Sequence, residues 1–533
     1  MKLTKVLSLV LVVVMLASML IACGDDTETT TPVETTPAAT TPAETTPAAT
    51  TPAETTPADT TPAETTPAET TPAETTPAET TPADTTPADT TPAETLPVIT
   101  WGDKTVDVLG NGWWSSSGSW TPVEFWVAEY GENTVENAVL DRTNYLNENF
   151  GVTFNFILQT SPKIDNIASS VEAGTKDYDL WMPKILDIQS IVANKLVFDL
   201  SDSEYIDFSK SYYNQISRNA FTIADHTFFA TGDFNYITYE VTYLWFVNAA
   251  LGENVDGFPE DLYQLVRDGE WTLDLAFDLA RQIGGDANGD GIMDLNDNYG
   301  LVTGSPSAWP SMMGVNTVEA VDGEYTLGVN NSTRATKILG YILQMVNSDW
   351  YTQTAWTDSE SVFKDGRCLF YQEVVQKFSG YFGNDPDTVI LPNPKLDKND
   401  TVYGTTGAYS QAQTICIPKC TEDRAMSEYF FELLFQTGSE MIMPEYLDSK
   451  LIDANPDIYE DSVDMLVNYI FPGATIDVGT QTKGWSGYPW ENILSNSISN
   501  KTNTFAADYA ANAEAAQEIL DEWNTIWADY SED

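Results

Sequence analysis

The sequence predicts an α/β protein in which parallel strands alternate with covering helices. Two runs of strand length, Thr105–Gly110 and Val152–Phe156, flank a segment whose apolar residues recur at helical spacing. A third apolar run, Asp177–Met182, follows a second segment of helical pattern. This strand–helix–strand–helix–strand order indicates a parallel sheet covered on both faces.

The first predicted helix follows a loop rich in glycine, serine and tryptophan, and Gly151 supplies its stop. Ligands of open parallel sheets bind at the carboxyl ends of the strands. We therefore expect the ligand side to include the loops around Trp113 and Trp181. The apolar positions that define this helix are Val135, Val139, Leu146 and Phe150.

Later segments continue the alternation of strands and helices. An aromatic run over 238–248 predicts a strand, and Cys368–Tyr371 predicts another. Thr272 is the expected N-cap of a helix that Gly284 and Gly285 end. This helix would bury Leu275, Leu279 and Ile283. A stripe near the C-terminus predicts a last helix, and its Trp523 and Trp527, like Trp245, are assigned to the core; the stripe is Ile519, Trp523, Ile526, Trp527 and Tyr530.

The N-terminus has the pattern of a secretory signal. Lys2 and Lys5 precede an apolar run over 6–21, and Cys23 follows small and apolar residues. This segment resembles the bacterial lipobox, which implies a signal peptide over 1–22 and a lipid on Cys23. The alternative is a membrane-spanning helix, because the run approaches the length that crosses a bilayer.

Residues 23–97 form a repeat tether after the signal. A five-residue unit, TTPAE with variants, places a proline at every fifth position from Pro32 to Pro97. The repeat has too few apolar groups to offset the entropy of ordering, so we expect a disordered, extended spacer that reaches about 200 Å at most. Such a length indicates a thick wall and hence a Gram-positive surface. Whether its threonines are glycosylated stays open.

The charge excludes several classes of partner. The formal net charge of -56 argues against binding nucleic acid or anionic lipid through the protein surface. Removing the 14 acids of residues 24–97 and the two leader lysines from the totals of 80 and 24 leaves 66 acidic and 22 basic residues. The globular part is therefore acidic itself, which favours neutral ligands over anionic ones. Its length predicts two or more lobes.

The order of several segments resembles a known family. ADHTFFATGDFNYIT, LWFVN, GEWTLDLAFDLARQI, FKDGRCLFYQE and YGTTGAYSQAQTICIP occur in this order. They resemble extracellular solute-binding proteins of ABC importers, in particular the family 1 sugar-binding lipoproteins of gut Firmicutes. The resemblance implies a monomeric, two-lobed clamp of the type II periplasmic-binding-protein kind, with mostly parallel sheets and crossovers at a hinge. Its lobes would be about 98–236 with 409–456, and 237–408 with 457–533.

One segment has the spacing of a calcium loop. Oxygen side chains occupy loop positions 1, 3, 5, 9 and 12, with Gly291 at position 6. The segment resembles the dockerin version of the EF-hand loop, although a strand follows it instead of a helix. We expect one structural Ca²⁺ and no organic cofactor; the alternative is a metal-free turn. The expected ligands are Asp286, Asn288, Asp290, Ile292 through its carbonyl, Asp294 and Asp297.

Candidate ligand contacts are aromatic rings, carboxylates and amides in loops, because sugars present apolar faces and hydroxyl groups. The resemblance puts Asp233, Asn235 and Tyr236 where the chain crosses between lobes, and Gln372 and Glu373 at a frequent contact position. For each residue the alternative is ordinary packing. The remaining candidates, taken from their loop positions, are Trp113, Trp114, Trp120, Trp181, Trp309 and Trp485.

Catalysis has little support in the sequence. His226 is the only histidine, so a Ser-His-Asp or Cys-His arrangement would have to use it. A Cys416–Cys420 bridge is possible, but Pro418 and the short gap between the two cysteines disfavour it. Cys368 resembles a buried apolar residue. We expect a non-enzymatic, lipid-anchored binding protein that delivers an oligosaccharide to an ABC permease at the outer face of the cell membrane. The alternatives are a carbohydrate-binding adhesin and a secreted glycoside hydrolase.

Overall fold

A computed structural model describes residues 96–111, 123–159, 164–304, 306–329, 333–353, 356–378, 387–407, 414–451, 459–481 and 488–531. The chain divides after Thr90 into two units, and all the described residues belong to the second. The predicted signal peptide, Cys23 and most of the repeat tether lie outside the described residues. In the part that is described, no helix is long and apolar enough to cross a membrane.

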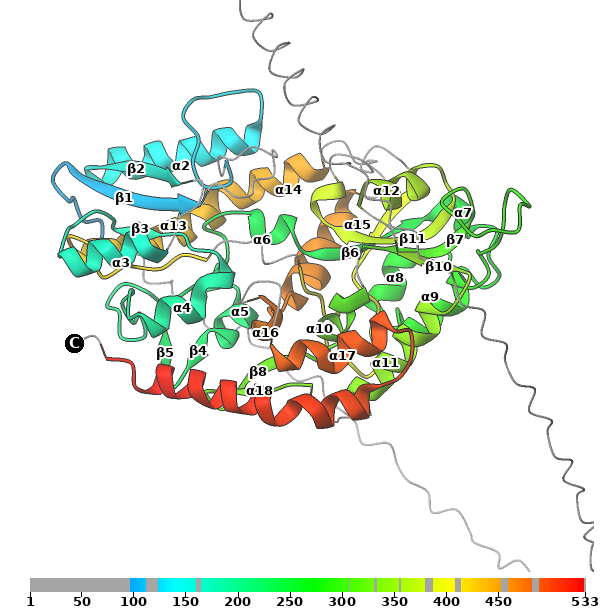
Figure 1. The fold of residues 1–533 in the computed structure, drawn as a ribbon. Helices are drawn as coiled ribbons and strands as arrows, with labels where there is room; N and C mark the ends of the chain where they lie inside the picture. The colour runs from blue at the N-terminus through cyan, green and yellow to red at the C-terminus, as the bar shows by residue number, and fades with distance from the viewer. Residues whose placement is uncertain are drawn as a thin grey trace, which may run out of the picture. The chain divides into compact units, whose positions relative to one another are not determined.

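The first sheet has the predicted parallel arrangement, with strand order β2-β1-β3. The pairing of β1 with β2 runs from Lys104↔Val152 to Asn111↔Gln159, and β3 pairs in parallel with the other edge of β1. Gly151 ends the intervening helix α2 in the left-handed conformation, with φ of 63°. Figure 1 shows α2 beside β1 and β2. The elements are β1 (Lys104–Asn111), α2 (Thr134–Phe150), β2 (Val152–Gln159), α3 (Ile164–Ala173) and β3 (Leu180–Trp181).

Two short segments extend this sheet beyond β3. Cys416 pairs with Trp181 in the antiparallel sense, and Ala230 pairs with Ile415 in the same sense. The segment at 415–416 is therefore reversed relative to both of its neighbours. The chain between β3 and this edge forms η1 (Ile185–Asp187), α4 (Ile188–Ala193), α5 (Gln215–Ala220), β4 (Thr222–Ile223) and β5 (His226–Thr227).

The second sheet has five strands in the order β10-β7-β11-β6-β12. Strand β7 is parallel to β10 and β11, whereas β6 is antiparallel to both β11 and β12. Four strands thus run in one direction and β6 runs against them, so the sheet is mixed. The strands are β6 (Tyr243–Asn248), β7 (Tyr299–Thr303), β10 (Tyr351–Gln353), β11 (Cys368–Val374) and β12 (Thr388–Leu391).

The strand predicted over 238–248 is wrong at its start. Residues Ile237–Glu240 form the short helix α6, because the N–H groups of Glu240 and Val241 donate to the carbonyls of Tyr236 and Ile237. The strand begins only at Tyr243. The predicted N-cap at Thr272 is confirmed, since its side chain accepts from Leu275 N, but that helix ends at Ala280.

Helices and a hairpin surround the second sheet. Those between β6 and β12 are α7 (Ala249–Gly252), α8 (Leu262–Arg267), α9 (Leu273–Ala280), η2 (Pro306–Ala308), α10 (Trp309–Met312), α11 (Thr333–Val346) and α12 (Trp356–Lys364), with the hairpin β8 (Val318–Val321) and β9 (Glu324–Leu327). The C-terminal elements are α13 (Arg424–Thr437), the π-helix η5 (Gly438–Ile442), α14 (Met443–Leu451), α15 (Tyr459–Asp464), the π-helix η6 (Met465–Ile470), η7 (Phe471–Gly473), α16 (Val478–Gln481), α17 (Pro489–Ser499) and α18 (Phe505–Ala528).

Three segments lie side by side between the two sheets. We call them the first (233–242), second (404–407) and third (471–476) crossing. Thr242 pairs with Gly407, and Thr405 pairs in parallel with Ala474. Tyr243 N donates to Thr406 O at 2.9 Å, and Thr475 N donates to Thr405 O at 2.9 Å. The second crossing is therefore held between the other two by backbone hydrogen bonds.

The apolar core is continuous across the predicted lobe boundary. One cluster includes Leu109 and Trp181 of the first sheet, apolar residues from all five strands of the second sheet, and Trp527 of α18. A second cluster fills the other face of the first sheet, against α13. Trp245 and Trp527 are fully buried and Trp523 is 6% exposed, which confirms their assignment to the core.

Candidate functional site

The carboxyl ends of both sheets are joined to the crossings. Thr414, which follows the second crossing, donates from its N–H to Pro183 O at 3.1 Å, just beyond β3. Val375, just beyond β11, donates from its N–H to Thr242 O at 2.9 Å. Because ligands of parallel sheets bind at the carboxyl ends of the strands, a candidate site is expected beside the crossings.

A pocket of about 450 Å³ lies at the first and third crossings, and we call it the crossing pocket. This volume falls within the range of about 300–1,000 Å³ that is usual for small-molecule sites. The lining contains apolar, aromatic, hydroxyl, amide and carboxyl groups, and no lysine or arginine occurs among these described residues. They are Ser211, Tyr213, Asn214, Gln215, Ile216, Asp233, Tyr239, Met443, Leu447, Val467, Phe471 and Pro472.

Asp233 is the only carboxyl group in this lining. It is 9% exposed and accepts a hydrogen bond from the hydroxyl of Tyr239. Burial raises the pKa of its carboxyl to about 6, although the hydroxyls of Tyr239 and Ser439 act in the opposite direction. Asp233 can therefore accept a hydrogen bond from a ligand hydroxyl without a nearby cation competing for it.

Aromatic rings form part of the same wall. The rings of Tyr239 and Phe471 lie 4.6 Å apart between centroids, at an interplanar angle of 57°. Tyr213 presents its ring while its hydroxyl donates to Glu432. Flat rings beside a carboxylate and amides suit a ligand with both apolar faces and hydroxyl groups.

Of the predicted loop 233–236, only Asp233 lines the pocket. Asn235 is fully buried, and its Oδ1 accepts from Ile237 N at 3.3 Å. Tyr236 stacks on Tyr446, with centroids 5.0 Å apart. These two residues shape the first crossing, and whether they contact a ligand stays a prediction.

The structure brings Trp309 and Gln372 together inside the core. Trp309 Nε1 donates to Gln372 Oε1 at 2.9 Å, and Gln372 Nε2 donates to Asn393 Oδ1 at 2.7 Å. Glu373 is 1% exposed; its carboxylate accepts from Val374 N and from the hydroxyl of Tyr371. Burial raises the pKa of Glu373 to about 7. The polar side-chain atoms of Trp309, Gln372 and Glu373 thus form hydrogen bonds with other residues of the protein.

Replacing Trp309 by phenylalanine should destabilise the ligand-free protein by about 1–3 kcal/mol, because Gln372 Oε1 loses its buried donor. Urea unfolding without ligand would measure this change. Trp126→Phe is the control, because Trp126 is half-buried and a phenyl ring can keep its stacking on Phe156. An unchanged midpoint for Trp309→Phe would show that the indole serves only a ligand.

The other predicted tryptophans fall into two groups. Trp181 is 1% exposed at the end of β3, where its backbone exchanges two hydrogen bonds of 2.9 Å with Cys416. Its indole Nε1 is buried without a partner among the described residues. The predicted contacts outside those residues are Trp113, Trp114, Trp120 and Trp485.

The predicted calcium loop connects α9 to β7. Asp286 accepts from the N–H groups of Gly289, Asp290 and Gly291, and Gly291 has a φ of 81°. Asp297 is fully buried and accepts from Ala287 N at 2.9 Å. The carboxylate, amide and backbone carbonyl oxygens of this loop are of the types that Ca²⁺ prefers as ligands.

No group of three or more His, Cys, Asp or Glu side chains in the described part of the chain is placed to hold a metal ion. The carboxylates of Asp286, Asp290, Asp294 and Asp297 accept hydrogen bonds from backbone N–H groups of the loop. The loop is suitable in composition, and its occupancy stays a prediction.

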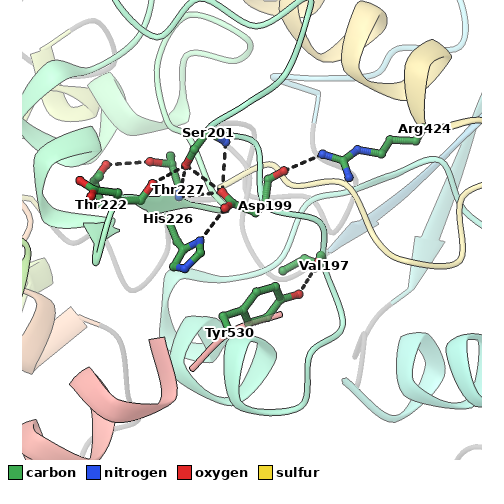
Figure 2. Close-up of polar contacts among 9 residues, drawn as sticks. Val197, Asp199, Ser201, Thr222, His226, Thr227, Arg424 and Tyr530 are labelled. Carbon is green, nitrogen blue, oxygen red and sulfur yellow. Dashed lines mark hydrogen bonds and ion pairs between the residues drawn. The ribbon is translucent and has the colours of Figure 1, made fainter. Parts of the chain in front are cut away.

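His226 is not part of a nucleophilic triad in this structure. Its Nδ1 lies 2.5 Å from Asp199 Oδ2, and Ser201 Oγ donates to the other oxygen of Asp199 at 2.8 Å (Figure 2). In a triad the serine contacts the histidine, whereas here both contact the carboxylate. Within the described residues, Cys368, Cys416 and Cys420 are buried free thiols, so the Cys416–Cys420 bridge is not formed.

Sequence reasoning missed most of the crossing pocket. Met443 and Leu447 come from α14, and Val467 and Phe471 come from a π-helix and the turn after it. Apolar residues in such segments carry no sequence signal of a binding loop. The run Tyr212–Gln215, which ends at the first residue of α5, is the one part of the described lining with the composition of a binding wall. Comparison of the sequence with protein-family models and with curated proteins gives no match.

Proposed function

We propose that this protein is a lipid-anchored, extracellular solute-binding protein that captures a carbohydrate and delivers it to an ABC permease. The observation that carries the proposal is a repeated sheet topology. The four strands of the second sheet that run in one direction are, in chain order, β7, β10, β11 and β12. In space their order is β10, β7, β11 and β12, and the reversed strand β6 lies between β11 and β12. In the first sheet the order is β2, β1, β3, the reversed segment at 415–416, and then Ala230.

The reversed strand of each sheet follows a crossing. Strand β6 begins at Tyr243, where the first crossing ends, and the segment at 415–416 follows the second crossing. The reversed strand of each sheet is therefore formed by a segment that reaches it from the other sheet through a crossing. Two equivalent halves connected in this way support a two-lobed, type II clamp whose hinge is formed by the crossings.

The crossing pocket supports a neutral, hydroxyl-rich ligand. It combines Tyr239 and Phe471 with the acceptor Asp233, and the described residues of its lining include no lysine or arginine that would attract an anionic ligand. At about 30 Å³ for each water molecule, its 450 Å³ corresponds to about 15 waters. A pocket of this size and polarity suits a sugar unit, and the further length of an oligosaccharide would extend from it.

A binding screen tests this proposal. The full chain should gain thermal stability with one or more mono- or oligosaccharides, and not with amino acids or short peptides, because ligand binding stabilises only the folded state. Stabilisation by peptides alone would contradict the sugar assignment and leave the importer assignment in place. Release of reducing sugar from a polysaccharide would instead indicate a glycoside hydrolase.

Replacing Cys23 by serine should release the protein from the membrane fraction into the medium, since the proposed lipid would have no attachment site. Fractionation followed by immunoblotting would measure this change. Ser8→Ala, within the predicted signal peptide, is a control that should leave membrane attachment unchanged. The anchor assignment fails if the wild-type protein is soluble and keeps Met1.

A further inference from the structure

The C-terminal helix α18 contacts both of the proposed lobes. It packs along α17 and β9, which belong to the second lobe, and its last turns reach α4 and β4, which belong to the first. Figure 1 shows α18 running past α17 and β8 towards β4 and β5. A single helix of 24 residues therefore connects the hairpin strand β9, 199 residues earlier at Tyr325, with α4, 338 residues earlier at Gln189.

The second lobe contacts α18 through hydrogen bonds and ring packing as far as Asn524, about one turn before the helix ends at Ala528. Tyr325 N donates to Asn524 Oδ1 at 2.7 Å, and Asn524 Nδ2 donates to Tyr325 O at 2.9 Å. The ring of Trp523 packs against Trp490, with centroids 5.4 Å apart. This pairing fixes α18 to the hairpin β8–β9 and to α17.

The first lobe holds the end of the helix and the residues after it. Trp527 Nε1 donates to Gln189 Oε1 at 3.0 Å, and the hydroxyl of Tyr530 donates to Val197 O. Both rings pack edge-on against Phe228, with centroid distances of 5.1 and 4.5 Å. Four aromatic and polar contacts thus hold the last turn.

The surface under Tyr530 belongs to the first lobe. Phe198 N donates to Ile417 O at 2.9 Å, next to the reversed segment of the first sheet. Arg424 of α13 donates to Asp199 O at 2.8 Å, and Asp199 contacts His226 (Figure 2). The loop that receives Tyr530 is therefore fixed to the first sheet and its covering helix.

We propose that residues 523–531 form a latch that keeps the two lobes together, and that its release from the first lobe is required for the clamp to open. This inference rests on the proposed clamp. When the lobes rotate about the crossings, one helix cannot follow both of them, so the contacts on one side must break. The release also has to break the bond between Ala224 N and Gly323 O, of 2.8 Å, at the hairpin tip.

The side that breaks is the first-lobe side. Its contacts are made by the last turn of α18 and by Tyr530, which lies beyond the helix end at Ala528. The second-lobe contacts run along the helix, from Asp508, whose Oδ1 accepts from Asn496 Nδ2 at 3.1 Å, to Trp523, which packs on Trp490. Breaking them would need all of α18 to move, whereas the first-lobe side depends on its last turn and Tyr530.

Distance measurements between spin labels test the latch in the full chain carrying Cys23→Ser, since Cys368, Cys416 and Cys420 are buried. One label pair, Glu172→Cys with Ser361→Cys, reports the separation of the lobes from exposed positions on α3 and α12. A second pair, Asn194→Cys with Asp529→Cys, reports whether the tail is bound.

Tyr530→Ala should broaden the 194/529 distances and shift the 172/361 distances to longer values. Tyr509→Ala is the matched control, because Tyr509 lies on the same helix and packs on Phe505. It should change neither pair. If Tyr530→Ala leaves the tail bound, Trp527→Leu is added to remove the bond to Gln189, and a tail that is still bound would overturn the latch.

Two other outcomes separate the latch from the clamp. A tail that is released while the 172/361 distances stay unchanged would overturn the latch alone. If a carbohydrate that raises the thermal midpoint does not shorten the lengthened 172/361 distances of Tyr530→Ala, no lobe closure accompanies binding, and the clamp itself would be contradicted. If the carbohydrate changes the 172/361 distances but Tyr530→Ala and Trp527→Leu do not, the clamp is kept and the latch is rejected.

Discussion

Removing calcium should lower the thermal midpoint of the full chain by several degrees. A ligand present at 100 times its dissociation constant stabilises the folded state by about 2.7 kcal/mol. The loop at 286–297 joins α9 to β7, the strand between β10 and β11 in the second sheet. Gly285 and Asn298 pair at the base of the loop, and Asn298 directly precedes β7. Calcium that orders the loop would therefore also stabilise the start of β7.

Calorimetry with calcium, and then with a chelator in excess, would measure this effect. Asp290→Asn should remove most of it while leaving the metal-free protein nearly unchanged, because an asparagine oxygen can still accept from Ile292 N. Magnesium is the control ion, since it demands a stricter octahedral geometry than this loop spacing offers. A midpoint that does not rise when calcium is restored would contradict the site.

The first sheet could be predicted from sequence because its signals are local. Each strand is an apolar run, and Gly151 marks the end of α2 by a conformation that glycine adopts easily. The aromatic run at 238–248 misled the prediction, since β-branched and aromatic residues favour a strand. In the fold, Tyr236 stacks on Tyr446 and Thr242 Oγ1 donates to Thr238 O, so tertiary contacts hold the first part as a turn of helix.

The crossings could not be predicted from local pattern. Thr405 pairs with Ala474 and Thr242 pairs with Gly407, across separations that no hydrophobic period encodes. Gly473 shows how specific the packing is, because a Cβ atom there would clash with Tyr403 O. The order of strands in the two sheets follows from these pairings, and so does the repeated topology on which the proposed function rests.

The candidate site was predicted only in part. The sequence places Asp233 among the candidate ligand contacts; in the structure it lines the pocket, and its contact with a ligand stays a prediction. Proline and serine around Trp309 predict a loop, but Trp309 is the first residue of the buried helix α10, and Pro310 lies in its first turn. Loop composition therefore did not distinguish an exposed ring from a ring that packs in the core beside Gln372.

Replacing Asp233 by asparagine should make the stability of the protein less dependent on pH. The folded-state pKa of Asp233 is about 6, above the ordinary value of 3.8, because of burial. The stability that comes from the neutral carboxyl is fully present below pH 3.8 and is lost as the pH rises through about 6. A shift of about two units corresponds to about 3 kcal/mol at most.

At pH 7.5 the asparagine variant should therefore be more stable than the wild type by up to about 3 kcal/mol, and the difference should vanish near pH 4. An asparagine oxygen can still accept from the hydroxyl of Tyr239, so the local contact survives. Urea unfolding at a series of pH values would measure both curves, with Asp202→Asn, at an exposed position, as the control. Parallel curves for Asp233→Asn and wild type would mean that the carboxyl is charged and solvated throughout. The pocket would then be open to water at Asp233, and its carboxylate would have to exchange hydration for ligand hydroxyls when a sugar binds.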